Sequence, residues 1–192
     1  MNGFILKLDF RNWVKSFNLI IVKGLPIMKR NRRNFIKVAS FTGLGIVGGT
    51  DGRQLYRQAW LMQAEQQIQS KNYNSALTSI STARLWPENL GVGKPYEDDI
   101  DSRLENYMEG ICYEKTKRPD QALKKWNEII SLKMNVYNTN TLVTALTLKK
   151  VSRHDEGEKL LSEWLIKEPD SKVARWCNEV YHGQIPTAEF EG

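Results

Sequence analysis

Residues that commonly build reactive centres are scarce in this 192-residue chain, which has two cysteines and two histidines. Cys112 and Cys177 lack CxxC spacing, and each falls on the apolar stripe of a predicted helix, where free cysteine behaves as a small hydrophobic residue. His154 and His182 have no Cys, Asp or Glu at metal-ligand spacing, and no nucleophile–base pair can be proposed. The sequence therefore predicts a protein that is not an enzyme, with no catalytic residues, no metal and no cofactor.

Excess positive charge is absent from most of the chain, although the formal net charge is +6. Residues 1–53 hold ten Lys/Arg against Asp9 and Asp51, a balance of +8, while residues 54–192 have a balance of −2. Binding to nucleic acid depends on cations that neutralise phosphates. The predicted folded part has no such excess, so we expect no nucleic-acid partner.

Long hydrophobic runs are also absent. The most apolar stretch, of about a dozen residues, follows Lys37 and is shorter than the roughly 20 residues that span a membrane. A basic cluster before a short apolar run is the layout of an export signal. Arg32, Arg33, Phe35 and Lys37 resemble the twin-arginine (Tat) motif, although Asn31 stands where that family usually has Ser or Thr.

The Tat resemblance implies that residues 28–53 contact the inner membrane and the Tat translocase of a bacterium. The protein would then be periplasmic, or anchored in the inner membrane on the periplasmic side. No clear Ala-x-Ala site follows, so the signal is either removed or kept as an anchor. Residues 1–27 are an upstream extension that is either untranslated, with Met28 as the start, or a signal preamble. The alternative is a cytoplasmic protein whose first helix is basic and amphipathic.

From Gln54 onward, apolar residues recur at helical spacing. The pattern predicts a helix from Gln54 to about Ser70, one from Asn74 to Trp86, one beginning near Ile100 and one ending near Ile130. A helical hairpin is expected over Thr139–Lys167 and a last helix over Asp170–Tyr181. Residues 184–192 are expected to form a tail.

Small residues mark a repeat within this pattern. Ala76, Ala122 and Gly157 are 46 and 35 residues apart, and the excess in the first interval fits an inserted loop at 88–99. With Trp60, Tyr73 and Pro87, these residues resemble the tetratricopeptide (TPR) repeat. The resemblance implies an all-α fold over 54–183: about seven helices in antiparallel hairpins, stacked as a short right-handed superhelix.

In TPR-like arrays the first helix of each hairpin lines a concave groove that binds extended or helical peptides. By that resemblance the groove would include Leu61, Glu65, Ile68, Tyr107, Ile111, Glu114, Leu142, Leu146 and Lys149. Each of these residues has an equally good interpretation as inter-helix core. Lys94 and Tyr96 in the inserted loop form a second candidate contact.

The acidic cluster Glu97, Asp98, Asp99 and Asp101 lacks the alternation and central glycine of a calcium loop. We expect these acids to favour the start of the following helix. The leading hypothesis is an exported module that holds a protein or peptide partner; its homo-oligomeric state stays open. The linker 87–95 and Asp101-Ser102-Arg103 also resemble the C-terminal repeat region of bacterial DUF5107-domain proteins, so the alternative is an accessory or remnant repeat domain of a carbohydrate-processing protein.

Overall fold

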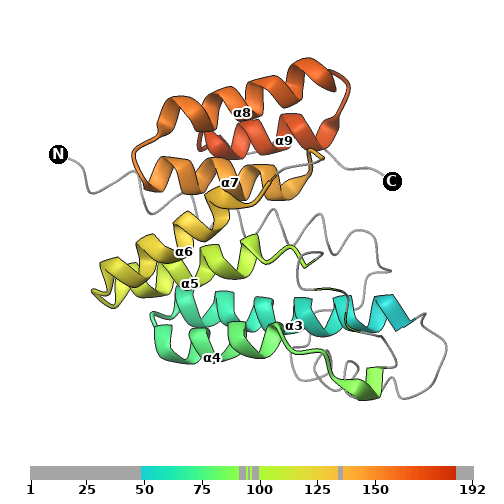
Figure 1. The fold of residues 1–192 in the computed structure, drawn as a ribbon, viewed down its shortest axis with the longest axis vertical. Helices are drawn as coiled ribbons and strands as arrows, with labels where there is room; N and C mark the ends of the chain where they lie inside the picture. Colours follow the sequence, from blue (N-terminus) through green and yellow to red (C-terminus); the bar gives the residue numbers. More distant parts are fainter. Residues whose placement is uncertain (1–48, 91–93, 95, 97–99, 134–135, 185–192) are drawn as a thin grey trace. The chain divides into compact units, whose positions relative to one another are not determined.

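A computed structural model describes residues 49–90, 94, 96, 100–133 and 136–184. These residues belong to two compact units, the N-terminal unit (described residues 49–119) and the C-terminal unit (described residues 120–184). Both units are helical, and the described residues form seven α-helices, one 3-10 helix and no β-strand (Figure 1). The all-α fold class and the number of helices are confirmed, whereas the superhelical stacking stays a prediction.

The N-terminal unit is built on the hairpin of α3 (Gly49–Gln69) and α4 (Tyr73–Ala83), which pack along each other. The 3-10 helix η1 (Glu88–Leu90) follows and contacts α3. Helix α5 (Arg103–Lys115) packs against α4 and touches α3. The fully buried apolar side chains of these helices are Ala64, Ala76, Ile80, Ala83 and Cys112.

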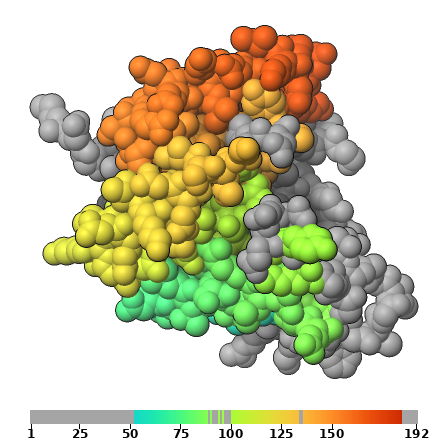
Figure 2. All heavy atoms as spheres, in the orientation of Figure 1, coloured from blue at the N-terminus to red at the C-terminus, as the bar shows by residue number. Residues whose placement is uncertain are grey.

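The C-terminal unit begins with α6 (Pro119–Ser131), which starts at the boundary between the units. Helix α7 (Thr139–Lys150) packs against both α8 (His154–Lys167) and α9 (Lys172–Tyr181), and those two helices also contact each other. Every residue from 141 to 148 is buried, so α7 is the central element of this unit. Helix α6 has an exposed side that includes Leu123 and Lys124. The surface of this helix is visible in yellow in Figure 2.

The same turn ends helices α3, α5 and α7. At each end one residue has a positive φ: Lys71 (61°), Lys117 (60°) and Ser152 (63°). The N–H of the following residue donates to the carbonyl five residues earlier, as from Asn72 to Gln67 O (2.7 Å). This pair of features defines the Schellman motif, which satisfies the last carbonyls of a helix.

The recurring turn carries the spacing of the repeat. Lys71, Lys117 and Ser152 are 46 and 35 residues apart, the intervals predicted from Ala76, Ala122 and Gly157. Each small residue follows its turn by five positions and is buried. Helix α9 ends in the same way at Gly183, whose φ is 73°. A helical-repeat architecture is therefore visible in the local geometry of both units.

Helix starts differ slightly from the sequence-based expectations. Helix α3 begins at Gly49, five residues before the predicted Gln54. Helix α9 begins at Lys172 because Ser171 is the N-cap, with its Oγ accepting from Ala174 N at 3.2 Å. No helix in the described part of the chain is both long and apolar enough to span a bilayer.

Candidate functional site

Four apolar residues predicted to line the groove lie on α3 and α5 of the N-terminal unit. Leu61, Ile68, Tyr107 and Ile111 are all buried, with 5–7% of their surface exposed. Side chains with so little exposed area act in helix packing in this structure. Their role in binding a partner stays a prediction.

The two acidic groove residues differ in exposure. Glu65 is buried, and its Oε1 accepts a hydrogen bond from Gln69 Nε2 at 2.5 Å. Glu114 is half-buried near the end of α5. Of the predicted groove residues in this unit, Glu114 is therefore the one with surface left for a partner.

The remaining groove residues lie on α7 of the C-terminal unit. Leu142 is fully buried and Leu146 is 5% exposed. Lys149 is half-buried, and its Nζ donates to Tyr181 O at 3.2 Å and lies 4.8 Å from the centre of the Tyr181 ring. Lys149 therefore ties α7 to the end of α9.

The loop contact is exposed: Tyr96 has 85% of its surface accessible, and Lys94 is exposed as well. The predicted export residues Arg32, Arg33, Phe35 and Lys37 lie outside the described residues. Of the acidic cluster, only Asp101 is described. Its Oδ1 accepts from Arg103 N at 3.0 Å, so Asp101, which precedes the N-cap residue Ser102, satisfies the first N–H of α5.

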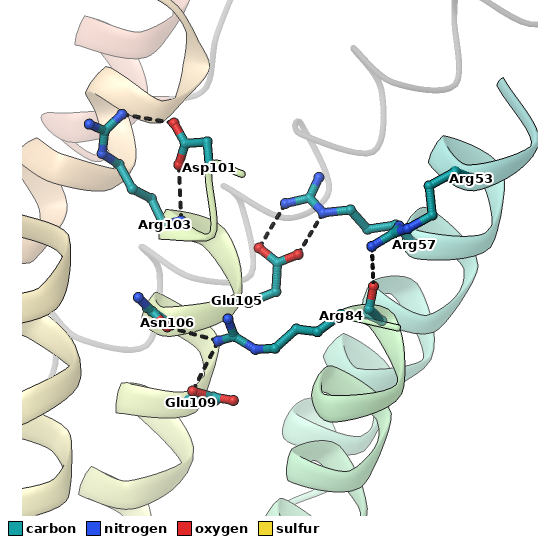
Figure 3. Close-up of polar contacts among 9 residues, drawn as sticks. Arg53, Arg57, Arg84, Asp101, Arg103, Glu105, Asn106 and Glu109 are labelled. Atoms are coloured by element: carbon teal, nitrogen blue, oxygen red, sulfur yellow. Dashed lines mark hydrogen bonds and ion pairs between the residues drawn. The ribbon is translucent and has the colours of Figure 1, made fainter. Parts of the chain in front are cut away.

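Sequence reasoning missed a network of charged side chains in the N-terminal unit (Figure 3). Its central contact joins α3 to α5, with Arg57 Nε and Nη2 donating to the two oxygens of Glu105 at 2.5 and 2.7 Å. Glu105 is 3% exposed and Arg57 27%. Burial alone would lower the pKa of Arg57, but the hydrogen bonds and charge of Glu105 raise it. This bidentate ion pair joins α3 to α5 through two residues that are 48 positions apart in the chain.

A second arginine connects α4 with α5. Arg84, just after α4, donates from Nη2 to Asn106 Oδ1 at 2.8 Å and pairs with Glu109 Oε2 at 3.1 Å. Arg103 at the start of α5 pairs with Asp101 at 2.9 Å. The first half of α5 therefore places several polar side chains in an environment where helices normally bury apolar ones.

Arg53 makes different contacts from the other arginines of the network. It is 5% exposed, its Nη2 donates to Ala83 O at 2.9 Å, and its guanidinium carbon lies 4.4 Å from the centre of the Trp86 ring. Its Nε is buried and makes no hydrogen bond. Burial, followed by the charge of Arg57, lowers the pKa of Arg53. The aromatic face and the helix-end carbonyl take the place of a carboxylate partner.

The network has a structural explanation that needs no ligand. A buried charge that loses its partner is costly, so the Arg57–Glu105 pair disfavours arrangements of α3 and α5 that separate the two side chains. No sequence rule pairs residues 48 positions apart. The available signal is the run of polar residues Arg103, Glu105 and Asn106 within an apolar helical pattern.

The two cysteines are free and buried, one in each unit. Burial, aided by the charge of Glu109, raises the pKa of Cys112 to about 12, and burial raises the pKa of Cys177 as well. The thiolate is the nucleophilic form, so both thiols are unreactive at neutral pH while the fold is closed. The described residues also contain no group of three His, Cys, Asp or Glu that could hold a metal ion.

Comparison with known proteins returns no match to any family model, to any curated protein or to any solved structure.

Proposed function

We propose that this protein is an exported, non-catalytic helical-repeat module of TPR type that holds a protein or peptide partner. The supporting observation is the Schellman turn at Lys71, Lys117 and Ser152 and its fixed distance to a buried small residue. Repeated hairpins of this kind build extended binding surfaces, which is their general use.

The burial pattern changes which of the predicted contact residues we expect to bind a partner. The apolar groove residues support the packing of the hairpins, whereas Glu114, Lys94 and Tyr96 have exposed area to offer a partner. Exposed tyrosine is a favourable contact residue, because it supplies a large rigid surface with one polar end. Tyr96 is the residue on which we expect partner binding to depend most.

The non-catalytic assignment is supported by the state of the thiols. Cys112 and Cys177 are buried and protonated. Export rests on the residues around Arg32 and Arg33, and fractionation of cells tests it directly. Protein found only in the cytosol, both for wild type and for Arg32→Lys with Arg33→Lys, would refute export.

The binding proposal is tested by affinity purification of the tagged full chain from its native host, with quantitative mass spectrometry. Lys94→Ala with Tyr96→Ala should deplete the specific partner at least tenfold, and Glu114→Ala should weaken its capture. Lys159→Ala is the matched control, because Lys159 is 76% exposed on α8 and should leave capture unchanged. Equal recovery with all variants would contradict the loop contact.

A further variant separates core from groove. Tyr107→Ala with Leu142→Ala should lower helicity and thermal stability, since both side chains are buried. Full helicity with lost capture would instead return these residues to the binding surface. The alternative is an accessory repeat domain of a carbohydrate-processing protein. Co-purification of a protein that carries a DUF5107 domain would favour it.

A further inference from the structure

The start of α3 lies inside the segment that the sequence pattern ascribes to the export signal. That segment was predicted to end at residue 53, but α3 runs from Gly49. Gly52 and Arg53, near the start of this helix, both lie close to other parts of the N-terminal unit. Their contacts decide whether they belong to the signal or to the folded module.

Arg53 is integrated into the module by three contacts. Arg53 is buried, with 5% of its surface exposed. Its side chain donates a hydrogen bond to the carbonyl of Ala83 at the end of α4, and its guanidinium group lies over the Trp86 ring. Its Tyr56 neighbour lies one turn further along α3, with the ring centre 6.0 Å away. Removal of Arg53 would leave the end of α4 without this donor and would uncover Trp86.

Gly52 faces the same region. A Cβ atom added there would lie 4.0 Å from Leu90 Cδ2, in ordinary van der Waals contact, and η1 packs on α3. Trp86 and Leu90 therefore lie next to the first turns of α3. The beginning of the helix and the beginning of the inserted loop stabilise each other.

We infer that Arg53 is the N-terminal anchor of the folded module, and that any proteolytic processing of the N-terminal segment cuts before Gly52. A peptidase binds its substrate with the backbone extended. The peptide bond after Arg53 instead lies within helix α3, and the Arg53 side chain is buried. The processing limit rests on the proposed export of the protein. The role of Arg53 in the fold does not depend on export.

Limited trypsin digestion of the purified full chain tests the anchor. The bonds after Arg53 and Arg57 should resist cleavage in the wild type. Arg53→Ala should increase cleavage after Arg57 at least tenfold, because the first turns of α3 lose their contacts. Gln54→Ala is the matched control: Gln54 is exposed on the next position of α3, and its loss should leave the rate unchanged.

Intact-mass measurement of the chain from its native host tests the processing limit. A first residue at or before Gly52 is expected, including an uncut chain. A mature chain that begins at or after Arg53, or equal cleavage rates for wild type and Arg53→Ala, would overturn the inference. A cytosolic, uncut protein with a protected Arg57 bond would refute export while leaving the anchor intact.

Discussion

The two units of this protein bury polar groups by different means. In the N-terminal unit a buried carboxylate is paired with an arginine from another helix, as Glu105 and Arg57 show. In the C-terminal unit the buried polar groups of α7 are threonines that bond within their own helix, such as Thr147 Oγ1 to Val143 O at 2.7 Å. One unit therefore depends on a specific long-range pair, and the other depends on close packing around α7.

The cysteines allow each unit to be followed separately. Cys112 lies in the N-terminal unit and Cys177 in the C-terminal unit, and both are buried. A thiol reagent can reach each one only when its own surroundings open. Labelling in denaturant with peptide mapping therefore reports two opening free energies from one unmodified chain.

The largest effect is expected from Glu105→Ala. Removing one partner of a buried ion pair costs about 3–5 kcal/mol, and we expect the lower end because Arg57 is partly exposed. Labelling of Cys112 should accelerate strongly, whereas labelling of Cys177 should respond less.

Glu156→Ala is the control for that change. Its pair with Arg153 is exposed, with side-chain exposures of 45% and 55%, so little change is expected. An equal response to both substitutions would contradict a special role for the Arg57–Glu105 pair. Arg57→Ala combined with Glu105→Ala should be less damaging than the two single changes added together.

Gly157→Ala tests the packing of the C-terminal unit. A Cβ there would lie 2.7 Å from Tyr181 Oη and 2.9 Å from the backbone oxygen of Ala145, so neighbouring helices must shift. Overpacking of this kind costs about 1–3 kcal/mol. Urea denaturation should show the loss, and Cys177 should label faster.

Gly52→Ala is the matched change in the N-terminal unit. The added methyl would have Leu90 in ordinary contact, and alanine favours a helix over glycine by roughly 0.5–1 kcal/mol. Stability should therefore hold or rise. Destabilisation of similar size at both glycines would remove the contrast between the units.

Alkaline pH should destabilise both units, because each contains buried weak acids. Burial raises the pKa of Cys112 to about 12, and burial also raises the pKa values of Cys177 and Tyr181. Each group is protonated in the fold and loses its proton first in the unfolded chain, so stability is complete below the ordinary pKa and falls as pH rises toward the folded value. The slope is about 1.4 kcal/mol per pH unit for each such group.

Above about pH 10, where free tyrosine ionises, Cys177 and Tyr181 both contribute to this slope in the C-terminal unit. Urea midpoints between pH 9 and 11 should therefore fall less steeply for Tyr181→Phe than for wild type. That variant should begin from a lower stability, by about 0.5–1.5 kcal/mol, because Tyr181 Oη donates to His154 O at 3.1 Å. An unchanged slope would contradict a buried, neutral phenol.

The smallest change in stability is expected at the recurring turn, which both units contain. Lys117 and Ser152 occupy the same left-handed position of the recurring turn. Left-handed backbone costs most residues about 1–2 kcal/mol, and glycine recovers part of this at an entropic cost of about 0.5–1 kcal/mol. Lys117→Gly and Ser152→Gly should each raise thermal stability slightly, and opposite signs would show that the two turns are not equivalent.

Much of the helical layout follows from the sequence alone. The hairpin over Thr139–Lys167 has the bounds of α7 and α8, and the intervals between Ala76, Ala122 and Gly157 reappear in the turns. The residues of the candidate binding surface were harder to predict from the sequence. A residue such as Leu142 has the same pattern whether it faces a groove or a core, because periodicity gives the face of a helix and not what covers it.

The sequence by itself determined the helices, their turns and the positions of the small residues, since these depend on contacts between near neighbours in the chain. The tertiary structure alone decided that Arg57 meets Glu105, that Arg53 belongs to the folded module, and that most predicted groove residues are buried. Those outcomes depend on side chains from distant parts of the chain competing for the same space and the same partners, which no local pattern encodes.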